Sequence, residues 1–285
     1  MGLNKELIGK KYGPEDCEVD KHEAMFYALA TNDFNEAYIN GNREGEIVAP
    51  PMYVISKEIG GKVISLPLFD EDLKVNFAML VHGEQEIEWF KPLIHGSKLK
   101  STSSILDIID KGSGELLNVG AETEDEKGEL VARQVVGYFV RGGGSGKKSE
   151  KKPAPPEDRS KKLFEETMKV LLGQTYIYAE PSGDHNPIHI DNNFATSVGL
   201  PGIILQGLCT MAFVQKAVVD SVCSGDPLRL KKLSVRFSRP VLPGDTFTTI
   251  GWEKGESNDR LIVGLESSTQ KGDVVIKGAY AEVAK

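Results

Sequence analysis

Cysteine and long apolar runs are both scarce in this chain of 285 residues. Its three cysteines, Cys17, Cys209 and Cys223, are an odd number without metal-ligand spacing, so we expect reduced, buried thiols. No stretch of 18 or more apolar residues is present, which argues against a membrane-spanning helix. The first 25 residues lack the apolar core of a secretory signal, and the sequence ends in AEVAK rather than an SKL-type peroxisomal tail. The compartment is therefore left open.

Positive charge is also in deficit. The chain has 34 Lys and Arg residues against 42 Asp and Glu residues, and the resulting net charge of −8 argues against general nucleic-acid binding. A local basic patch could still hold a small phosphorylated ligand. The composition, 40% hydrophobic and 27% charged, is typical of a soluble globular protein, and the length suits one large domain or two of ordinary size.

Residues 142–160, GGGSGKKSEKKPAPPEDRS, contain almost no side chain that could be buried in a hydrophobic core. Gly, Ser, Lys, Pro and Glu dominate this stretch, which is typical of a flexible linker. The sequence therefore predicts two halves of similar length, residues 1–141 and 161–285, joined by a tether.

The two halves resemble each other. YALATNDFNEAYI at residues 27–39 aligns with YAEPSGDHNPIHI at 178–190, with an offset of 151. IEWFKPLIHGSKL at 87–99 aligns with VRFSRPVLPGDTF at 235–247, with an offset of 148. Two matched blocks in the same order at nearly constant offset indicate an internal duplication.

The C-terminal half predicts a helix beside a sheet. Residues 203–222 are apolar almost all round, which is typical of a buried helix. Strands are expected at 230–237, 246–251, 261–266 and 274–283, and Gly183, Asn186 and Pro187 mark a turn. We also expect short helices at 161–172 and 192–198, and a strand at 175–179. By duplication, each half would carry one long buried helix wrapped by an antiparallel sheet, an α+β pseudo-dimer.

The stretch SGDHNPIHID, residues 182–191, is unusually rich in titratable groups. Asp184, His185, His189 and Asp191 could supply metal ligands, but they share no helical face and no further Cys or His cluster lies nearby. A polar surface turn is a second interpretation, in which Asp191 caps the following helix and His185 is a loop residue. The third is acid–base chemistry by a carboxylate and an imidazole that hold one water.

The duplication favours the third interpretation in one half only. Asp184 and Asn186 align with Asp33 and Asn35, whereas His189 aligns with Tyr38. If the stretch is catalytic, the C-terminal half carries the site and the N-terminal half assists it.

The run Y-x-x-x-S-G-D-x-N-P-x-H (Tyr178–His189), followed by FA (Phe194–Ala195) and I-L-x-G-L-C-T (Ile204–Thr210), resembles the R-specific enoyl-CoA hydratases, or MaoC-like dehydratases. The similarity extends through the PGDT block, and the N-terminal half resembles the degenerate domain of the eukaryotic members. The resemblance implies a double hot-dog fold and reversible hydration of trans-2-enoyl-CoA to (3R)-3-hydroxyacyl-CoA, with neither a metal nor an organic cofactor. It also makes a homodimer and a peroxisomal location plausible.

By this resemblance, Asp184 and His189 form the catalytic pair, Asn186 positions them, and Gly207 offers its backbone N–H to the thioester oxygen. Relatives often have His where this chain has Gln206, which we expect to bind the substrate and to modify the support of the pair. We further expect the nucleotide part of CoA to contact basic residues of the second repeat block, namely Lys231, Lys232, Arg236 and Arg239.

The acyl chain needs an apolar channel, which we expect in the N-terminal half near Ala78 and Met79. Two other functions stay open at this point. An acyl-CoA thioesterase would use a carboxylate on the same fold, and a non-catalytic acyl-CoA-binding protein would keep only the pocket.

Overall fold

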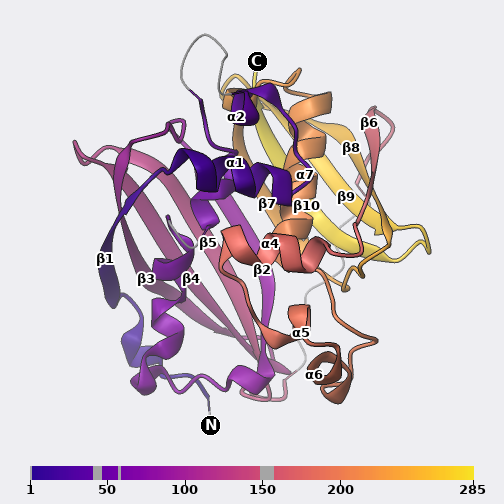
Figure 1. Ribbon diagram of the computed structural model, residues 1–285. Coiled ribbons are helices and arrows are strands. Elements are labelled where there is room, and N and C mark those ends of the chain that lie inside the picture. The colour runs from indigo at the N-terminus through magenta and orange to yellow at the C-terminus, as the bar shows by residue number, and fades with distance from the viewer. Residues whose placement is uncertain (1, 41–46, 57–58, 148–156) are drawn as a thin grey trace.

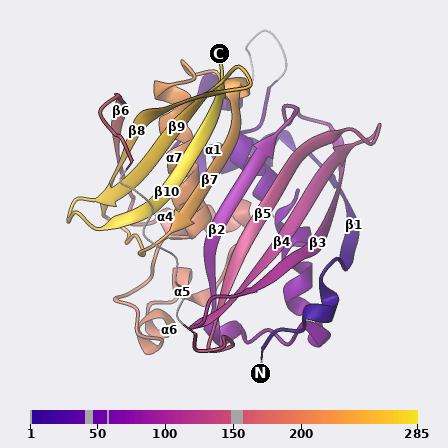
Figure 2. The ribbon, with the colours of Figure 1, turned by 180° about the vertical axis from the view of Figure 1, so that it is seen from behind.

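Ten antiparallel strands form one continuous sheet in the computed structural model, which describes residues 2–40, 47–56, 59–147 and 157–285 (Figures 1 and 2). The spatial order is β1-β3-β4-β5-β2-β7-β10-β9-β8-β6. The strands are β1 (Lys11–Glu18), β2 (Leu80–Trp89), β3 (Lys98–Asp110), β4 (Gly114–Asp125), β5 (Leu130–Arg141), β6 (Lys162–Lys169), β7 (Leu230–Phe237), β8 (Thr246–Ser257), β9 (Arg260–Thr269) and β10 (Val274–Ala284).

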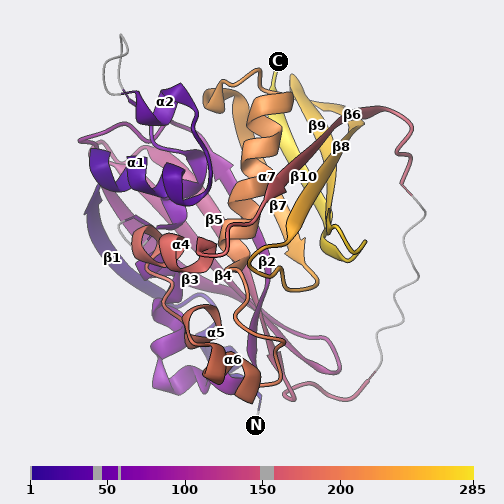
Figure 3. The ribbon, with the colours of Figure 1, turned by 45° about the vertical axis from the view of Figure 1, so that its right-hand side comes forward.

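The two halves meet where β2 pairs with β7, and Figure 2 shows these strands at the middle of the sheet. The register joins Glu84 to Arg236 and Glu88 to Lys232, a reciprocal pattern expected of two copies related by a pseudo-twofold axis. On the other face, helices α1 (Lys21–Ala30) and α4 (Gln174–Ser182) lie side by side (Figure 3). The hydroxyls of Tyr27 and Tyr178 are 3.2 Å apart there. The structure therefore confirms the predicted duplication.

The C-terminal half has the expected layout. Its strands curve around α7 (Gly207–Ser221), which lies against their concave face (Figures 1 and 3). Ten of the helix's 15 residues are buried, including Met211, Phe213 and Val218, which explains its apolar sequence on all sides. None of the helices in the described ranges is long and apolar enough to cross a membrane.

The N-terminal half differs from the expectation of a second long helix. Among its described residues, the segment facing the sheet consists of the short elements η2 (Pro51–Ile55), α3 (Gly61–Ser65) and η3 (Leu66–Phe69). Prolines at 50, 51 and 67 and the glycine pair at 60–61 disfavour a continuous helix here. The prediction of a long central helix is thus right for one half and wrong for the other.

Backbone hydrogen bonds fix which residues of the two halves are equivalent. The N–H of Ala49 donates to Leu93 at 2.8 Å, and the N–H of Leu205 donates to Val241 at 2.8 Å. Leu93 and Val241 are already matched by the offset of 148. Two residues further on, η2 begins at Pro51 and α7 begins at Gly207. Pro51 therefore occupies the position of Gly207.

Two local predictions are wrong. The stretch 161–172 contains strand β6, which pairs with β8, rather than a helix. Its apolar Phe164 and Met168 are four residues apart, a spacing that places side chains on one face of a helix and also on one face of a strand. The stretch 175–179 belongs to helix α4 rather than to a strand. Packing of Tyr178 against Tyr27 outweighs the strand preference of aromatic residues there.

The ends of the predicted linker 142–160 are attached to the fold. The N–H groups of Gly142 and Gly146 donate to Ser113 and Gly112. On the other side, Arg159 pairs with Glu266 through two 2.8 Å hydrogen bonds and lies over the Trp252 ring. Residues 148–156 lie outside the described ranges.

Candidate active site

The turn after α4 positions the groups of the D-x-N-P-x-H stretch. The Asn186 side chain accepts the backbone N–H of Ile188 at 3.3 Å and so caps the short helix α5 (Pro187–Ile190). The Asp184 carboxylate accepts the N–H of Asn186, also at 3.3 Å. This arrangement leaves Asn186 and His185 exposed, whereas His189 is buried.

Asp184 and His189 converge. The His189 Nε2 atom lies 3.6 Å from Asp184 Oδ2, with the imidazole 8% and the carboxylate 37% exposed. His189 Nδ1 is 2.7 Å from the Ile204 carbonyl oxygen. Because a carbonyl oxygen only accepts, Nδ1 carries the hydrogen of this bond, so the tautomer with a hydrogen on Nδ1 alone has Nε2 as the acceptor that faces Asp184. The pair therefore offers two hydrogen-bond acceptors at a point that solvent can reach.

Gly207 is the first residue of α7, four residues after the expected start at 203, and Gln206 is its N-cap residue. No side chain of the described residues caps this end, so its first N–H groups and the positive end of the helix dipole are available to an oxygen atom. A Cβ at Gly207 would lie 3.4 Å from the Phe237 ring. Glycine keeps the space between that ring and the helix end open.

Gln206 forms hydrogen bonds to the backbone of the turn that carries Asp184. Its side chain is fully buried, and its Nε2 donates to the carbonyl oxygens of Thr175 at 2.9 Å and of Asp184 at 3.3 Å. Gln206 thereby ties the backbone of Asp184 to the start of α4. It is a positioning residue here rather than a group facing the substrate.

The N-terminal half contributes His82 and Tyr138, which sequence reasoning missed. They are opposite each other on β2 and β5, beside a bulge at Gly83, and the His82 ring lies 5.2 Å from the Phe237 ring. Burial lowers the pKa of His82 to about 4, and the negative charge of Asp184 opposes that shift. Burial and the Asp184 charge together raise the pKa of Tyr138. The site therefore lies between the halves and is walled by neutral groups.

The four basic residues expected to bind CoA are spread along β7 and beyond it. Arg236 and Arg239 lie near Phe237, at the catalytic end, and pair with Glu84 and Asp273. Lys232 pairs with Glu86 at 2.7 Å. Lys231 lines a different pocket at the start of the strand, roughly 20 Å away at 3.3 Å per residue. Arg236 and Arg239 are thus better placed for a ligand at Asp184.

Asp191 accepts the backbone N–H groups of Asn193 and Phe194 and caps α6 (Asn192–Ser197), which confirms the prediction for this residue. The described part of the chain holds no group of three or more His, Cys, Asp or Glu side chains arranged to bind a metal ion.

The equivalent turn of the N-terminal half has the same backbone and different chemistry. Asn35 caps α2 (Glu36–Ile39) as Asn186 caps α5, and Asp33 accepts the N–H of Asn35. However, Asp33 is only 2% exposed, and Tyr38 stands in the place of His189. Asp33 Oδ2 and the Tyr38 hydroxyl have no hydrogen-bond partner among the described residues. The carboxylate in the turn of the N-terminal half is therefore closed to solvent, and this turn has no imidazole.

Comparison with known proteins agrees with this two-half organisation. Residues 18–142 match the MFE-2 hydratase 2 N-terminal domain, and residues 155–272 match the MaoC like domain. The chain is 36% identical over 221 residues to the peroxisomal multifunctional enzyme type 2 of Mus musculus, covering 74% of this chain but only 28% of that protein. It is 36% identical to the 3-hydroxyacyl-thioester dehydratase Y of Mycobacterium tuberculosis over the full length of both.

Solved structures show the same fold. The MaoC-like dehydratase of Phytophthora capsici superposes with a TM-score of 0.83 at 28% identity over 98% of both chains. A Mycobacterium tuberculosis protein described as a double hotdog fold superposes with a TM-score of 0.61 at 10% identity, over 96% of this chain and 95% of that one. The expected α+β double hot-dog class is confirmed. This chain belongs to the MaoC-like dehydratases, in the branch whose N-terminal half is an MFE-2 hydratase 2 domain.

Proposed function

We propose that this protein hydrates trans-2-enoyl-CoA reversibly to (3R)-3-hydroxyacyl-CoA, with Asp184 and His189 as the catalytic residues. The observation that carries the proposal is the approach of His189 Nε2 to Asp184 Oδ2 at 3.6 Å beside the uncapped start of α7. The name of the Mycobacterium tuberculosis relative, 3-hydroxyacyl-thioester dehydratase Y, supports the substrate class.

The reaction adds H and OH across the Cα–Cβ double bond. A water beside both acceptors loses a proton to the pair as its oxygen bonds to Cβ, and the pair then passes that proton to Cα, so that H and OH of one water are added in total. Negative charge builds on the thioester oxygen in between. The backbone N–H of Gly207 meets that oxygen and stabilises the transition state more than the substrate, an effect typically worth ~3 kcal/mol. No metal or organic cofactor takes part in this scheme.

The acyl tail would follow the seam between β2 and β5 into the N-terminal half. Side chains on one face of this pair run from His82 and Tyr138 to Leu80 and Val140. The row ends at a cavity of about 190 Å³ whose lining includes Val140 and Met79 and also the polar residues Lys74, Asn76, Glu115 and Arg141. Of the two residues expected to line the channel, Met79 faces this cavity, whereas Ala78 does not line it. The described residues of the N-terminal half form no second long helix, and we infer that this leaves room for the path.

A thioesterase is the main alternative, because it would use the same carboxylate to activate water. The acceptor nitrogen of His189 facing Asp184 favours the two-group chemistry of hydration. Crotonyl-CoA separates the two: hydration removes the absorbance of the conjugated thioester without releasing thiol, and hydrolysis releases CoA. Chiral analysis of the 3-hydroxybutyryl product then tests the (3R) assignment. Release of stoichiometric thiol, or no absorbance change, would refute the proposal.

A further inference from the structure

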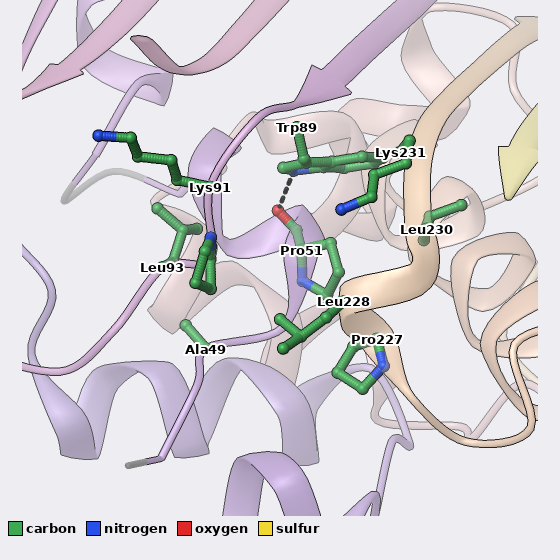
Figure 4. A pocket seen from close by; sticks show the side chains of 10 residues that line it. Ala49, Pro51, Trp89, Lys91, Leu93, Pro227, Leu228, Leu230 and Lys231 are labelled. Carbon is green, nitrogen blue, oxygen red and sulfur yellow. Dashed lines mark hydrogen bonds between the residues drawn. The ribbon is translucent and has the colours of Figure 1, made fainter. Parts of the chain in front are cut away.

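A second pocket lies between the halves, where β2 ends and β7 begins (Figure 4). It has a volume of about 170 Å³ and is mainly apolar, with walls formed by Pro51, Trp89, Leu93, Pro227, Leu228 and Leu230. It is separate from the catalytic pair, which lies at the other ends of these strands. Neither the proposed reaction nor the acyl channel uses it.

This pocket is the pseudo-symmetric counterpart of the catalytic site. The repeat offset of 148 places Trp89 in the position of Phe237 and Leu230 in the position of His82. The backbone equivalence described above places Pro51 in the position of Gly207. Both sites thus lie at the start of the helical segment, against the central strands and between the halves.

The groups needed for hydration are missing from this copy. Pro51 has no N–H to donate, and its carbonyl oxygen accepts the indole N–H of Trp89 at 2.9 Å (Figure 4). Tyr38 stands where an imidazole is required, and Asp33 is buried. What persists is a small apolar cavity, made more apolar by Leu230 where the active copy has His82.

Two lysines, Lys91 and Lys231, line the cavity. Figure 4 shows the Lys231 amine turned toward the space between Trp89 and Leu228. No ion pair is formed by Lys231 within the described ranges, whereas the second lysine of the pocket, Lys91, is bound to Asp125 and Glu129. The equivalent of Lys231 in the catalytic site is Gly83, so this charge belongs to the second pocket alone.

We propose that this pocket binds a short aliphatic carboxylate of about six carbons in all, with its alkyl body against Trp89 and its carboxylate at Lys231. An apolar cavity of ~150 Å³ takes up a molecule of benzene size, so 170 Å³ suits this length. A charge-assisted hydrogen bond to Lys231 supplies the selectivity for an anion. The choice of an alkyl chain rests on the proposed function, because the pocket is the counterpart of an acyl-thioester site.

The test follows the fluorescence of Trp89 during titration with hexanoate. Trp252→Phe leaves Trp89 as the sole tryptophan, and isothermal titration calorimetry of the unsubstituted protein serves as a second measurement. We expect saturable binding that weakens at least tenfold in Lys231→Met. Lys277→Met, which removes an exposed lysine of β10, should leave the affinity unchanged. Hexan-1-ol should bind equally to the Lys231→Met protein and to its parent.

Asp184→Asn distinguishes this site from the catalytic one. We expect hexanoate to bind this variant with unchanged affinity even though hydration is lost. Loss of binding in Asp184→Asn would mean that hexanoate occupies the catalytic site, which overturns the inference. Equal affinity in Lys231→Met, or no saturable signal by either method, would also overturn it. None of these outcomes depends on whether the protein hydrates enoyl-CoA.

Discussion

Asp33→Asn should stabilise the folded protein at neutral pH. Burial raises the pKa of the Asp33 carboxyl to about 6, with Asp220 adding to the rise and Lys216 and the Asn35 N–H opposing it. One carboxylate oxygen and the nearby Tyr38 hydroxyl lack partners among the described residues. The folded state therefore tolerates a neutral group at this position better than a charge.

The size of the effect follows from linkage. The pKa of Asp33 rises from 3.8 in the unfolded chain to about 6, a difference of roughly two units or ~3 kcal/mol. Because the pKa of Asp33 is higher in the folded protein than in the unfolded chain, the stabilising effect of its protonated carboxyl is fully present below pH 4. It is lost as the pH rises through 6. Asn keeps the acceptor for the Asn35 N–H and carries no charge, so the variant should gain up to ~3 kcal/mol at pH 7.5 and nothing at pH 4.

Thermal and urea unfolding at pH 4 and pH 7.5 measure this difference. A gain of this size corresponds to a rise in Tm of roughly 5 °C or more for a chain of this length. Asp16→Asn, at a side chain that is 88% exposed, is the control and should be neutral at both pH values. If Asp33→Asn were no more stable than the parent at pH 7.5, the buried carboxylate would not be the unfavourable group that its environment implies.

Three further results are expected. Asp184→Asn and His189→Gln should each lower kcat for crotonyl-CoA hydration by at least a hundredfold with unchanged thermal unfolding, and a rate near that of the parent for both would contradict their roles. Gln206→Leu leaves the buried Thr175 carbonyl without its donor and should cost about 1–3 kcal/mol of stability with a fall in kcat, both checked on one preparation. Met79→Trp should raise KM for decenoyl-CoA while leaving that for crotonyl-CoA unchanged, and equal effects on both would exclude the acyl path.

Features that depend on local pattern were predictable from the sequence. The long apolar run became α7, and the alternating segments became β7 to β10, because one buried face dictates each pattern. The duplication predicted a pseudo-dimer, and the Tyr27–Tyr178 pair lies on its axis. The approach of Asp184 to His189 was expected only from the resemblance to the hydratase family, because their spacing in the sequence does not show that the two side chains converge.

Features that depend on the partner half were not predictable. His82 is far from Asp184 in the sequence, and it enters the site only because β2 pairs with β7. The duplication could have indicated this contribution. In a pseudo-dimer whose halves meet at equivalent strands, an active site beside β7 of one half also contacts β2 of the other half. The N-terminal half has short helical segments in place of one long helix because of Pro50 and Pro51. The prediction of a long helix there was based on the duplication and did not take these prolines into account.

The two copies of the turn also separate structure from chemistry at Asn186. Asn35, in the inactive copy, makes the same cap and accepts the same kind of N–H bond, so this part of the motif shapes the turn without catalysis. Asn186→Ala should therefore lower kcat by moving Asp184, and Asn186→Ser, which keeps a capping oxygen, should restore most of it. Asn35→Ala is the matched control: it should lose about 1 kcal/mol or more of stability with kcat intact. If Asn186→Ser were as slow as Asn186→Ala, the amide itself would act on the substrate or the water, and its likeness to Asn35 would be limited to the fold.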